Sequence, residues 1–241
     1  MTTKKLLLVA ATALAAAAVL APTKCLSKTI TIAVVDTGID AATNTKLCKY
    51  GHKSFVDLYP LRDNGGHGTH VAGLIKKYAG KGNYCIVSVK WWAPHLPPEV
   101  ASENMRRAIA YANNINADFI NVSGGGNTPS SGERAVVEQA LNRKATFVVA
   151  AGNEYSNLDN QCDYFPACYD KRLVVVGNLH DSIQLNREPS SNFGSYVNRW
   201  EVGTNVVSDF PGKRKAVLTG TSQAAAIATG KLVRLKLSSR K

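Results

Sequence analysis

Apolar runs of strand length alternate along the chain with segments whose apolar residues recur at helical spacing. The strand-like runs are rich in Val and Ile and mostly lack polar alternation, as is typical of strands buried on both faces: TITIAVVD (29–36), YCIVSVK (84–90), DFINVS (118–123), ATFVVAAG (145–152) and RLVVVGN (172–178). The helix-like segments are GTHVAGLIKKYA (68–79), EVASENMRRAIAYANNI (99–115) and GERAVVEQALNRK (132–144). This alternation predicts an α/β fold, a three-layer, doubly wound and mostly parallel sheet with helices on both faces.

Composition agrees with one globular domain that has a sizeable core, since 45% of the 241 residues are hydrophobic. The formal net charge of +12 favours anionic surfaces or acidic substrates and carries no information about the fold. No basic run carries the interleaved aromatic residues of a nucleic-acid groove, so we expect a solvated basic face and no nucleic-acid partner.

The N-terminal segment has the features of a secretory signal peptide. Lys4 and Lys5 precede the apolar stretch LLLVAATALAAAAVL, which is too short and too rich in Ala to be a good membrane span. Cleavage after Ala21 would leave a proline next in the chain, and cleavage after Ser27 is the other candidate. We therefore expect residues 1–27 to be removed, no stable membrane anchor, and a secreted (extracellular or periplasmic) domain formed by residues 28–241.

Cleavage after Ser27 would remove Cys25 and leave an even set of cysteines: Cys48, Cys85, Cys162 and Cys168. An even number in an exported chain indicates two disulfides, for which four cysteines allow three pairings. One pair lies six residues apart across a predicted loop, and the other two cysteines lie near strand ends. We expect bonds between Cys162 and Cys168 and between Cys48 and Cys85.

Polar residues and glycines gather where three of the predicted strands end. Asp36 closes the first strand, Ser123 is followed by three glycines, and Gly152-Asn153 follows the fourth strand. Ligands of open α/β sheets bind at the carboxyl ends of the strands. A nucleotide cradle and a hydrolase are both compatible with this arrangement. The chain lacks a G-x-G-x-x-G fingerprint and a P-loop lysine, so the hydrolase is favoured.

The stretch LTGTSQAAAIATGKL offers a nucleophile for such a hydrolase. Ser222, or Thr221 beside it, could simply cap a buried helix. The alternative is that Ser222 is a nucleophile at the positive end of that helix. RDNGGHGTHVAG supplies a base through His67 and His70, which could also be a metal pair or packed core residues. No third ligand at suitable spacing accompanies them, so the sequence predicts no metal site.

Five sequence motifs resemble those of the subtilisin-like serine proteases, both in their local sequence and in their order along the chain: AVVDTGID, GGHGTHVAG, VSGGG, AAGNE and GTSQAAA. The resemblance covers roughly residues 29 to 237, and the order Asp, His, Ser separates this family from two other folds with the same triad. It implies a serine endopeptidase with a subtilisin-like fold that works through an acyl-enzyme. Asp36 would orient His67, His67 would be the general base, Ser222 the nucleophile, and Asn153 would donate to the oxyanion beside the Ser222 N–H. His70 would then be structural.

The resemblance also implies a site that binds protein or peptide substrates. Ser123, Gly124 and Gly125 match the segment that pairs with substrate backbone as an added strand, with Gly152 on the opposite wall. Tyr164 stands where many members have a glycine at the floor of the pocket for the residue before the scissile bond. A restricted pocket for small or medium side chains is therefore expected. Glu154 and Asp163 nearby could instead attract Lys or Arg, and a broad apolar pocket would result if Tyr164 pointed away.

The remaining expectations are a monomer with no cofactor for catalysis. Calcium stays open as a structural ion, with no ligand set identified in the sequence. Gln223 and Ala226 replace the family's usual Met and Pro after the nucleophile, and WWAPHLPPE (91–99) has prolines where the family often has glycines that bind substrate. These departures leave a second hypothesis, a catalytically silent peptide-binding relative of the same fold.

Overall fold

A computed structural model describes residues 28–44 and 46–240. The expected signal peptide at residues 1–27, with Cys25, lies outside the described residues. The elements in chain order are β1 (Ile30–Asp36), β2 (Lys53–Ser54), α1 (His67–Ala79), β3 (Tyr84–Lys90), α2 (Pro98–Asn114), β4 (Phe119–Val122), α3 (Ser131–Asn142), β5 (Thr146–Ala150), β6 (Val174–Leu179), β7 (Arg199–Val202), β8 (Val206–Phe210), β9 (Arg214–Leu218) and α4 (Thr221–Ser238).

Seven strands form one sheet in the order β2-β3-β1-β4-β5-β6-β7, and all six neighbouring pairs are parallel. The chain starts at β1 in the interior of the sheet, adds β3 on one side and then crosses to β4 on the other. This reversal creates the crevice at the carboxyl ends of β1 and β4 in which ligands of doubly wound folds bind. The predicted parallel sheet is therefore confirmed, and its switch point lies at Asp36.

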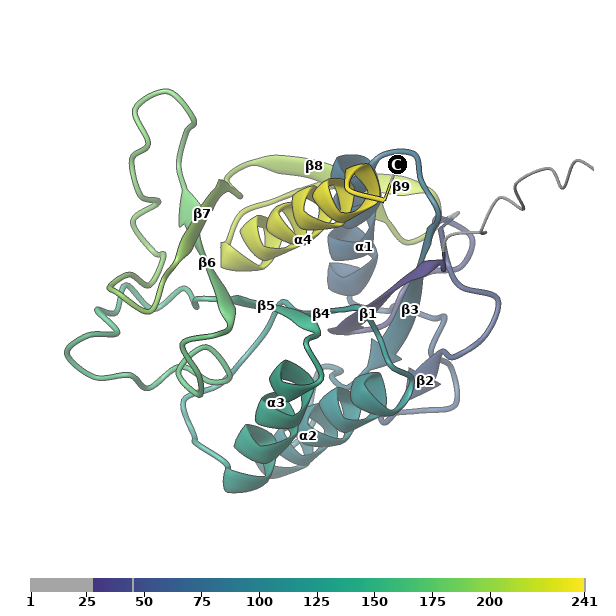
Figure 1. The fold of residues 1–241 in the computed structure, drawn as a ribbon, viewed down its shortest axis with the longest axis horizontal. Helices are drawn as coiled ribbons and strands as arrows, with labels where there is room; N and C mark the ends of the chain where they lie inside the picture. The colour runs from purple at the N-terminus through teal and green to yellow at the C-terminus, as the bar shows by residue number, and fades with distance from the viewer. Residues whose placement is uncertain (1–27, 45, 241) are drawn as a thin grey trace, which may run out of the picture.

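Helices cover both faces of the sheet, as Figure 1 shows, with α1 and α4 on one face and α2 and α3 on the other. Val71, Leu74 and Ile75 of α1 pack with Ile227 of α4 in one apolar cluster. Met105 and Ile109 of α2 belong to the cluster on the opposite face. The strands lie between these two layers of side chains, which explains why their sequences lack polar alternation.

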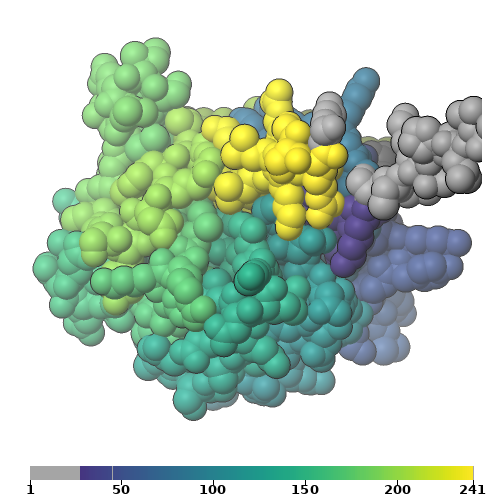
Figure 2. Space-filling model, viewed as in Figure 1, coloured from purple at the N-terminus to yellow at the C-terminus, as the bar shows by residue number. Residues whose placement is uncertain are grey.

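Four strands lie outside the predicted runs: β2, β7, β8 and β9. β8 and β9 form an antiparallel hairpin that packs on α1, where the Ser208 hydroxyl donates to the carbonyl oxygen of His70 (2.8 Å). The connection from β6 to β7 extends from the body of the molecule (Figures 1 and 2), and Ile183 on it is 91% exposed. None of the helices in residues 28–44 and 46–240 has both the length and the apolar character needed to cross a membrane.

Both expected disulfides are present. Cys48 is bonded to Cys85 at the edge of the sheet, and Cys162 is bonded to Cys168 in the loop before β6. The first closes a segment of 37 residues and ties the loop before β2 to β3, whereas the second spans six residues. Of the three pairings that four cysteines allow, the structure has the one predicted from the positions of the cysteines.

Candidate active site

Asp36 and His67 meet where β1 ends and α1 begins. The Nδ1 atom of His67 lies 2.8 Å from Oδ1 of Asp36, and this oxygen also accepts a hydrogen bond from the backbone N–H of Thr37 (2.7 Å). Asp36 is 3% exposed, and its Oδ2 atom has no hydrogen-bond partner in the described part of the chain. A buried carboxylate that accepts from Nδ1 fixes the orientation of the imidazole and leaves Nε2 free to accept a proton.

The start of α1 is held against β1 by Asp63, a residue that the motifs of the sequence did not single out. Its two carboxylate oxygens accept four hydrogen bonds, from Gly66 N and Thr37 Oγ1 and from the backbone and hydroxyl of Thr69. The close approach of α1 to the turn after β1 also requires glycine at position 68, because a Cβ there would lie 2.1 Å from the carbonyl oxygen of Gly38. The sequence signal that could have identified Asp63 is its position four residues before His67.

Two opposing effects act on the pKa of His67. Burial of the ring lowers the pKa, but the charge and hydrogen bond of Asp36 and the charge of Asp63 raise it by more. The net result is a pKa above the ordinary value of 6.5. The site therefore stabilises the imidazolium form, which is the form that a general base acquires during catalysis.

His70 has a different environment from His67. It is fully buried, and its Nε2 atom lies 3.1 Å from the carbonyl oxygen of Val206 and 3.2 Å from that of Ala216, in β8 and β9. Burial is the main reason that its pKa is lowered. His70 thus joins the β8–β9 hairpin to α1, and the two histidines do not converge as a metal pair.

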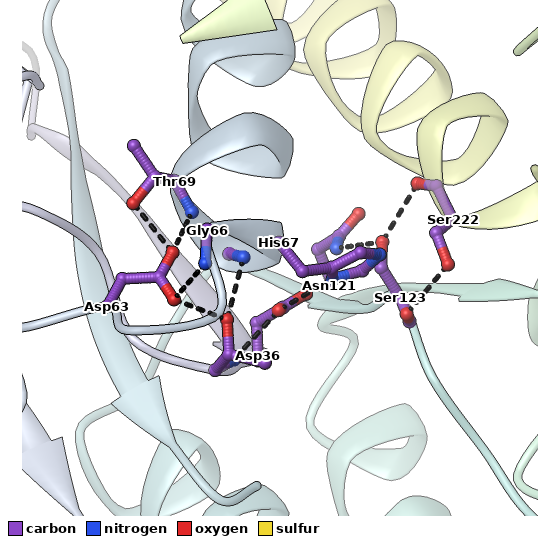
Figure 3. Close-up of polar contacts among 10 residues, drawn as sticks. Asp36, Asp63, Gly66, His67, Thr69, Asn121, Ser123 and Ser222 are labelled. Atoms are coloured by element: carbon purple, nitrogen blue, oxygen red, sulfur yellow. Dashed lines mark hydrogen bonds and ion pairs between the residues drawn. The ribbon is translucent and has the colours of Figure 1, made fainter. Parts of the chain in front are cut away.

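Ser222, the second residue of α4, lies beside Ser123 at the end of β4 (Figure 3). The Ser222 hydroxyl donates to the carbonyl oxygen of Ser123 (2.9 Å), and the Ser123 hydroxyl donates to the carbonyl oxygen of Ser222 (3.0 Å). Behind them, Asn121 donates to the Ser123 hydroxyl and accepts from Thr229 of α4. This buried network fixes the start of α4 against β4, with His67 between Asp36 and the two serines.

Asn153 contacts the same end of α4 from the loop after β5. Its Oδ1 atom accepts from the backbone N–H of Thr221 (2.9 Å) and from the Thr221 hydroxyl (3.1 Å). Because a backbone N–H can only donate, the amide oxygen must face Thr221, and the Nδ2 donor faces away. The N–H groups of Gln223 and Ala224 bond to the carbonyl oxygen of Gly220. Within the described residues the Ser222 N–H has no partner.

The helix-cap interpretation of the serine is wrong. The N-cap residue of α4 is Gly220, which has no side chain to cap the helix. Neither Thr221 nor Ser222 lies at the cap position, since both are inside the first turn. The start of α4 therefore presents an unpartnered N–H and an adjacent hydroxyl, an arrangement suited to an anion or a developing oxyanion.

A cleft of about 340 Å³ opens beside these groups and is lined by Asp36, His67, Ser123, Gly124, Gly125 and Tyr164, among others. Tyr164 is 8% exposed, and its ring lies between the two walls expected from the sequence to bind substrate. A Cβ added to Gly125 would lie 2.8 Å from this ring, and one added to Gly152 would lie 2.9 Å from it. The phenol thus fills the space between these walls instead of pointing away.

Two tryptophans complete the cleft, and neither was proposed as a site residue from the sequence. Trp91 and Trp92 follow β3 directly, and both line the cleft. Their position immediately after a buried strand was the signal that could have found them, because it places them at the carboxyl edge of the sheet. In the described ranges, no three His, Cys, Asp or Glu side chains are arranged to hold a metal ion.

Comparison with known proteins gives a sequence match over almost the whole described chain. The model of the subtilase family matches residues 27–239. Subtilisin NAT of Bacillus subtilis subsp. natto is 32% identical over 202 residues, which cover 81% of this chain and 52% of that protein. The major intracellular serine protease of Bacillus subtilis (strain 168) is 33% identical over 226 residues, which cover 87% of this chain and 69% of that protein. The chain spans about half the length of Subtilisin NAT.

Solved structures agree on the architecture. A lanthipeptide protease superposes with a TM-score of 0.77 at 21% identity, over 88% of this chain and 75% of its own. A cold-adapted subtilisin-like serine proteinase superposes with a TM-score of 0.70 at 25% identity, over 87% of this chain and 76% of its own. The subtilisin-like fold expected from the sequence is confirmed, and the chain belongs to the subtilase family.

Proposed function

We propose that this protein is a secreted serine endopeptidase that hydrolyses peptide bonds through Asp36, His67 and Ser222. The observation that carries the proposal is the convergence of a buried carboxylate–imidazole pair with a serine at the start of a helix, beside an amide donor. Each of these groups comes from a different element, β1, α1, α4 and the loop after β5. Packing alone gives no reason for this combination of side chains at one edge of the sheet.

In the proposed reaction, Ser222 Oγ attacks the carbonyl carbon of the scissile bond while Nε2 of His67 takes the hydroxyl proton. Asp36 keeps the proton on Nδ1 and stabilises the imidazolium that forms. The imidazolium then protonates the leaving amine, and the acyl-enzyme remains. Water hydrolyses this ester by the same steps, with His67 again as the base.

The negative charge on the tetrahedral carbonyl oxygen requires donors that are already in place. The Ser222 N–H, which has no partner among the described residues, and Nδ2 of Asn153 are the two candidates. The hydrogen bonds that Asn153 accepts from Thr221 support this role, because they orient the amide before substrate binds. Donors held in position in this way need no reorganisation when charge develops.

One contact favours the second hypothesis, a catalytically silent peptide-binding protein. The Ser222 hydroxyl donates to the Ser123 carbonyl oxygen, and no described contact joins it to His67. Under the first hypothesis, a substrate that pairs with Ser123 as an added strand would occupy this carbonyl and release the hydroxyl toward His67. Catalytic hydrogen bonds are often formed only in the complex with substrate, so this geometry is compatible with activity.

The position of Tyr164 supports a preference for small side chains at the residue before the scissile bond. The ring occupies the space between Gly125 and Gly152, where a larger substrate side chain would otherwise enter. Asn192 Nδ2 donates to Glu154 (2.7 Å), which engages one of the acids that could have attracted a basic residue. Protein or peptide substrates, a monomeric state and catalysis without a cofactor remain part of the proposal, and calcium stays open.

Export is supported by the two disulfides, which form and persist in oxidising compartments. The N-terminal sequence supports it independently. The test of the function is hydrolysis of casein by the purified protein. The wild type should hydrolyse casein, whereas Ser222→Ala and His67→Ala should each lose nearly all activity, because the triad acts as a unit. Wild-type cleavage by Ser222→Ala would rule out the assignment.

A further inference from the structure

A second cavity of about 220 Å³ adjoins the active-site cleft. It lies between α2, the segment after β4 and the start of α3. Trp91, Trp92 and Gly125 line both the cavity and the cleft, so the two lie side by side. A peptide that contacts these three residues in the cleft is therefore adjacent to the second cavity.

The cavity contains a buried carboxylate with an unpartnered oxygen. Glu133, in the first turn of α3, is 4% exposed and lines the cavity. Its backbone N–H is capped by the Ser130 hydroxyl, but its Oε1 atom is buried and receives no hydrogen bond from any described residue. A buried carboxylate without a donor is costly, so an occupant that supplies one would be stabilised there.

The charged and titratable groups around Glu133 do not supply that donor. Arg106 of α2 makes two hydrogen bonds to Glu103, and Arg134 donates to the carbonyl oxygen of Tyr169. The Tyr169 hydroxyl accepts from the backbone N–H of Ser130. Burial raises the pKa of Glu133 to about 7, and the charge of Glu133 contributes, after burial, to a pKa of about 12 for Tyr169.

The rest of the cavity suits a long aliphatic stem that ends in a cation. Trp91, Trp92, Met105 and Phe165 form its apolar walls, and Glu133 is the one acidic residue among the described residues that line it. Lys and Arg bury their methylene groups against such surfaces and direct the charged end to an acceptor. Aromatic faces add a further attraction for the cation.

The register of a bound strand identifies the substrate position. Neighbouring glycines of the substrate-binding segment face opposite sides: a Cβ at Gly124 would meet Trp91, and one at Gly125 would meet Tyr164. Side chains of a paired strand alternate in the same way. The residue before the scissile bond faces Tyr164, so the second and fourth residues on the acyl side face Trp91. Trp91 lines both the cleft that contains His67 and the second cavity. We therefore place the second residue beside His67 and the fourth, about 10 Å from the first, at the second cavity.

We propose that Glu133 is a specificity-determining residue that selects Lys or Arg at the fourth substrate residue on the acyl side of the scissile bond. The inference rests on the proposed function for its register. The two are tested separately, because recognition by Glu133 requires binding and does not require hydrolysis.

The first measurement compares two peptides that differ only at the fourth position, where one has Lys and the other the uncharged norleucine. The wild type should cleave the Lys peptide with a kcat/KM about 10–100-fold higher. Glu133→Gln should reduce this ratio to within about threefold. The matched control is Glu138→Gln on the same helix, which does not line the cavity and should leave the ratio unchanged. Thermal melting establishes that each variant is folded.

The second measurement uses Ser222→Ala protein and fluorescent versions of the two peptides, with the Kd as the readout. Tighter binding of the Lys peptide, lost in Ser222→Ala/Glu133→Gln, would support the inference even if the wild type proved unable to hydrolyse peptides. Equal kcat/KM and equal Kd for the Lys and norleucine peptides would overturn it, and this comparison requires no substitution at Glu133.

Discussion

The ring of Tyr164 packs against Gly125 so closely that a Cβ at position 125 would lie 2.8 Å from two ring carbons. The same ring lies against Gly152 on the other wall of the cleft. Under the proposed function, the ring occupies the volume that would otherwise accept the side chain before the scissile bond. Burial, together with the nearby Glu154 charge, raises the pKa of Tyr164 above its ordinary value of 10.0, so the phenol stays protonated well above neutral pH.

Shortening Tyr164 should open the pocket. The wild type should prefer Ala, Ser or Gly before the scissile bond, and Tyr164→Gly should gain at least about tenfold in kcat/KM for Phe relative to Ala. The measurement is cleavage-site profiling in a proteome-derived peptide library. Tyr155→Ala is the control, because Tyr155 lies in the same loop and is 64% exposed. A dominant wild-type preference for Phe or Tyr would contradict the restricted pocket.

Asn153→Ala should lower kcat with little effect on KM, because the amide is proposed to bind charge that exists only in the transition state. The expected loss is about 10²–10³-fold, the range by which removal of the corresponding donor slows subtilisin. Steady-state kinetics with a peptide substrate measure both constants. An increase in KM at unchanged kcat would instead assign Asn153 to ground-state binding.

The pKa of His67 should be measured by NMR titration of its imidazole. In the wild type it should lie above 6.5, and in Asp36→Asn it should fall, because burial remains while the charge of Asp36 is lost. The activity of the wild type should therefore decline on the acidic side at a pH above 6.5, as His67 becomes protonated. His70 is the internal control, and its pKa should stay below 6.5 in both proteins.

Raising the pH through the pKa of His67 should increase the activity of the protein but decrease the contribution of His67 to its stability. A histidine whose pKa is raised by folding stabilises the folded state fully below the unfolded pKa, and this contribution is lost as the pH rises through the folded value. The contribution of His67 is thus largest at a pH at which His67 is protonated and the proposed hydrolysis should be slow. An unfolding free energy whose His67-dependent part increased with pH would contradict this assignment.

Removing the Cys48–Cys85 bond should destabilise the protein more than removing Cys162–Cys168. The bonds close segments of 37 and 6 residues, for which the chain-entropy model gives about 4 and about 2 kcal/mol. Urea unfolding of the two double alanine variants measures the difference. A larger loss for Cys162→Ala/Cys168→Ala would show that local packing of the loop outweighs chain entropy.

The sequence predicted the parts of this fold whose signal is local. A continuous run such as YCIVSVK can only be a buried strand or a short buried helix, and the structure has a strand with the predicted limits, Tyr84–Lys90. Asp36, Ser123 and Asn153 were found because strand ends meet at one edge of a parallel sheet. The β8–β9 hairpin was missed, since its strands, VVSDF and RKAVL, contain charged residues and lack the continuous apolar runs of the strands in the central sheet.

The buried polar residues Glu133 and Asn121 were missed for a related reason. Glu133 in GERAVVEQ reads as an ordinary acid in the first turn of a helix, where charge is favourable and solvated. The cavity that it lines is formed with the tryptophans after β3 and with α2, which are distant in sequence. Asn121 is likewise a polar residue in an apolar strand, and its partner Thr229 lies 108 positions away. Burial of polar groups across elements has no periodicity by which a single sequence could reveal it.

The central claim is that Ser222 is an activated nucleophile, and covalent labelling by a fluorophosphonate probe tests it most directly. The purified wild-type protein should be labelled, with the mass increase located on the peptide that contains Ser222. Ser222→Ala should not be labelled, and labelling of His67→Ala should be strongly reduced. A folded wild-type protein that remains unlabelled, or a Ser222→Ala variant labelled like the wild type, would contradict this claim.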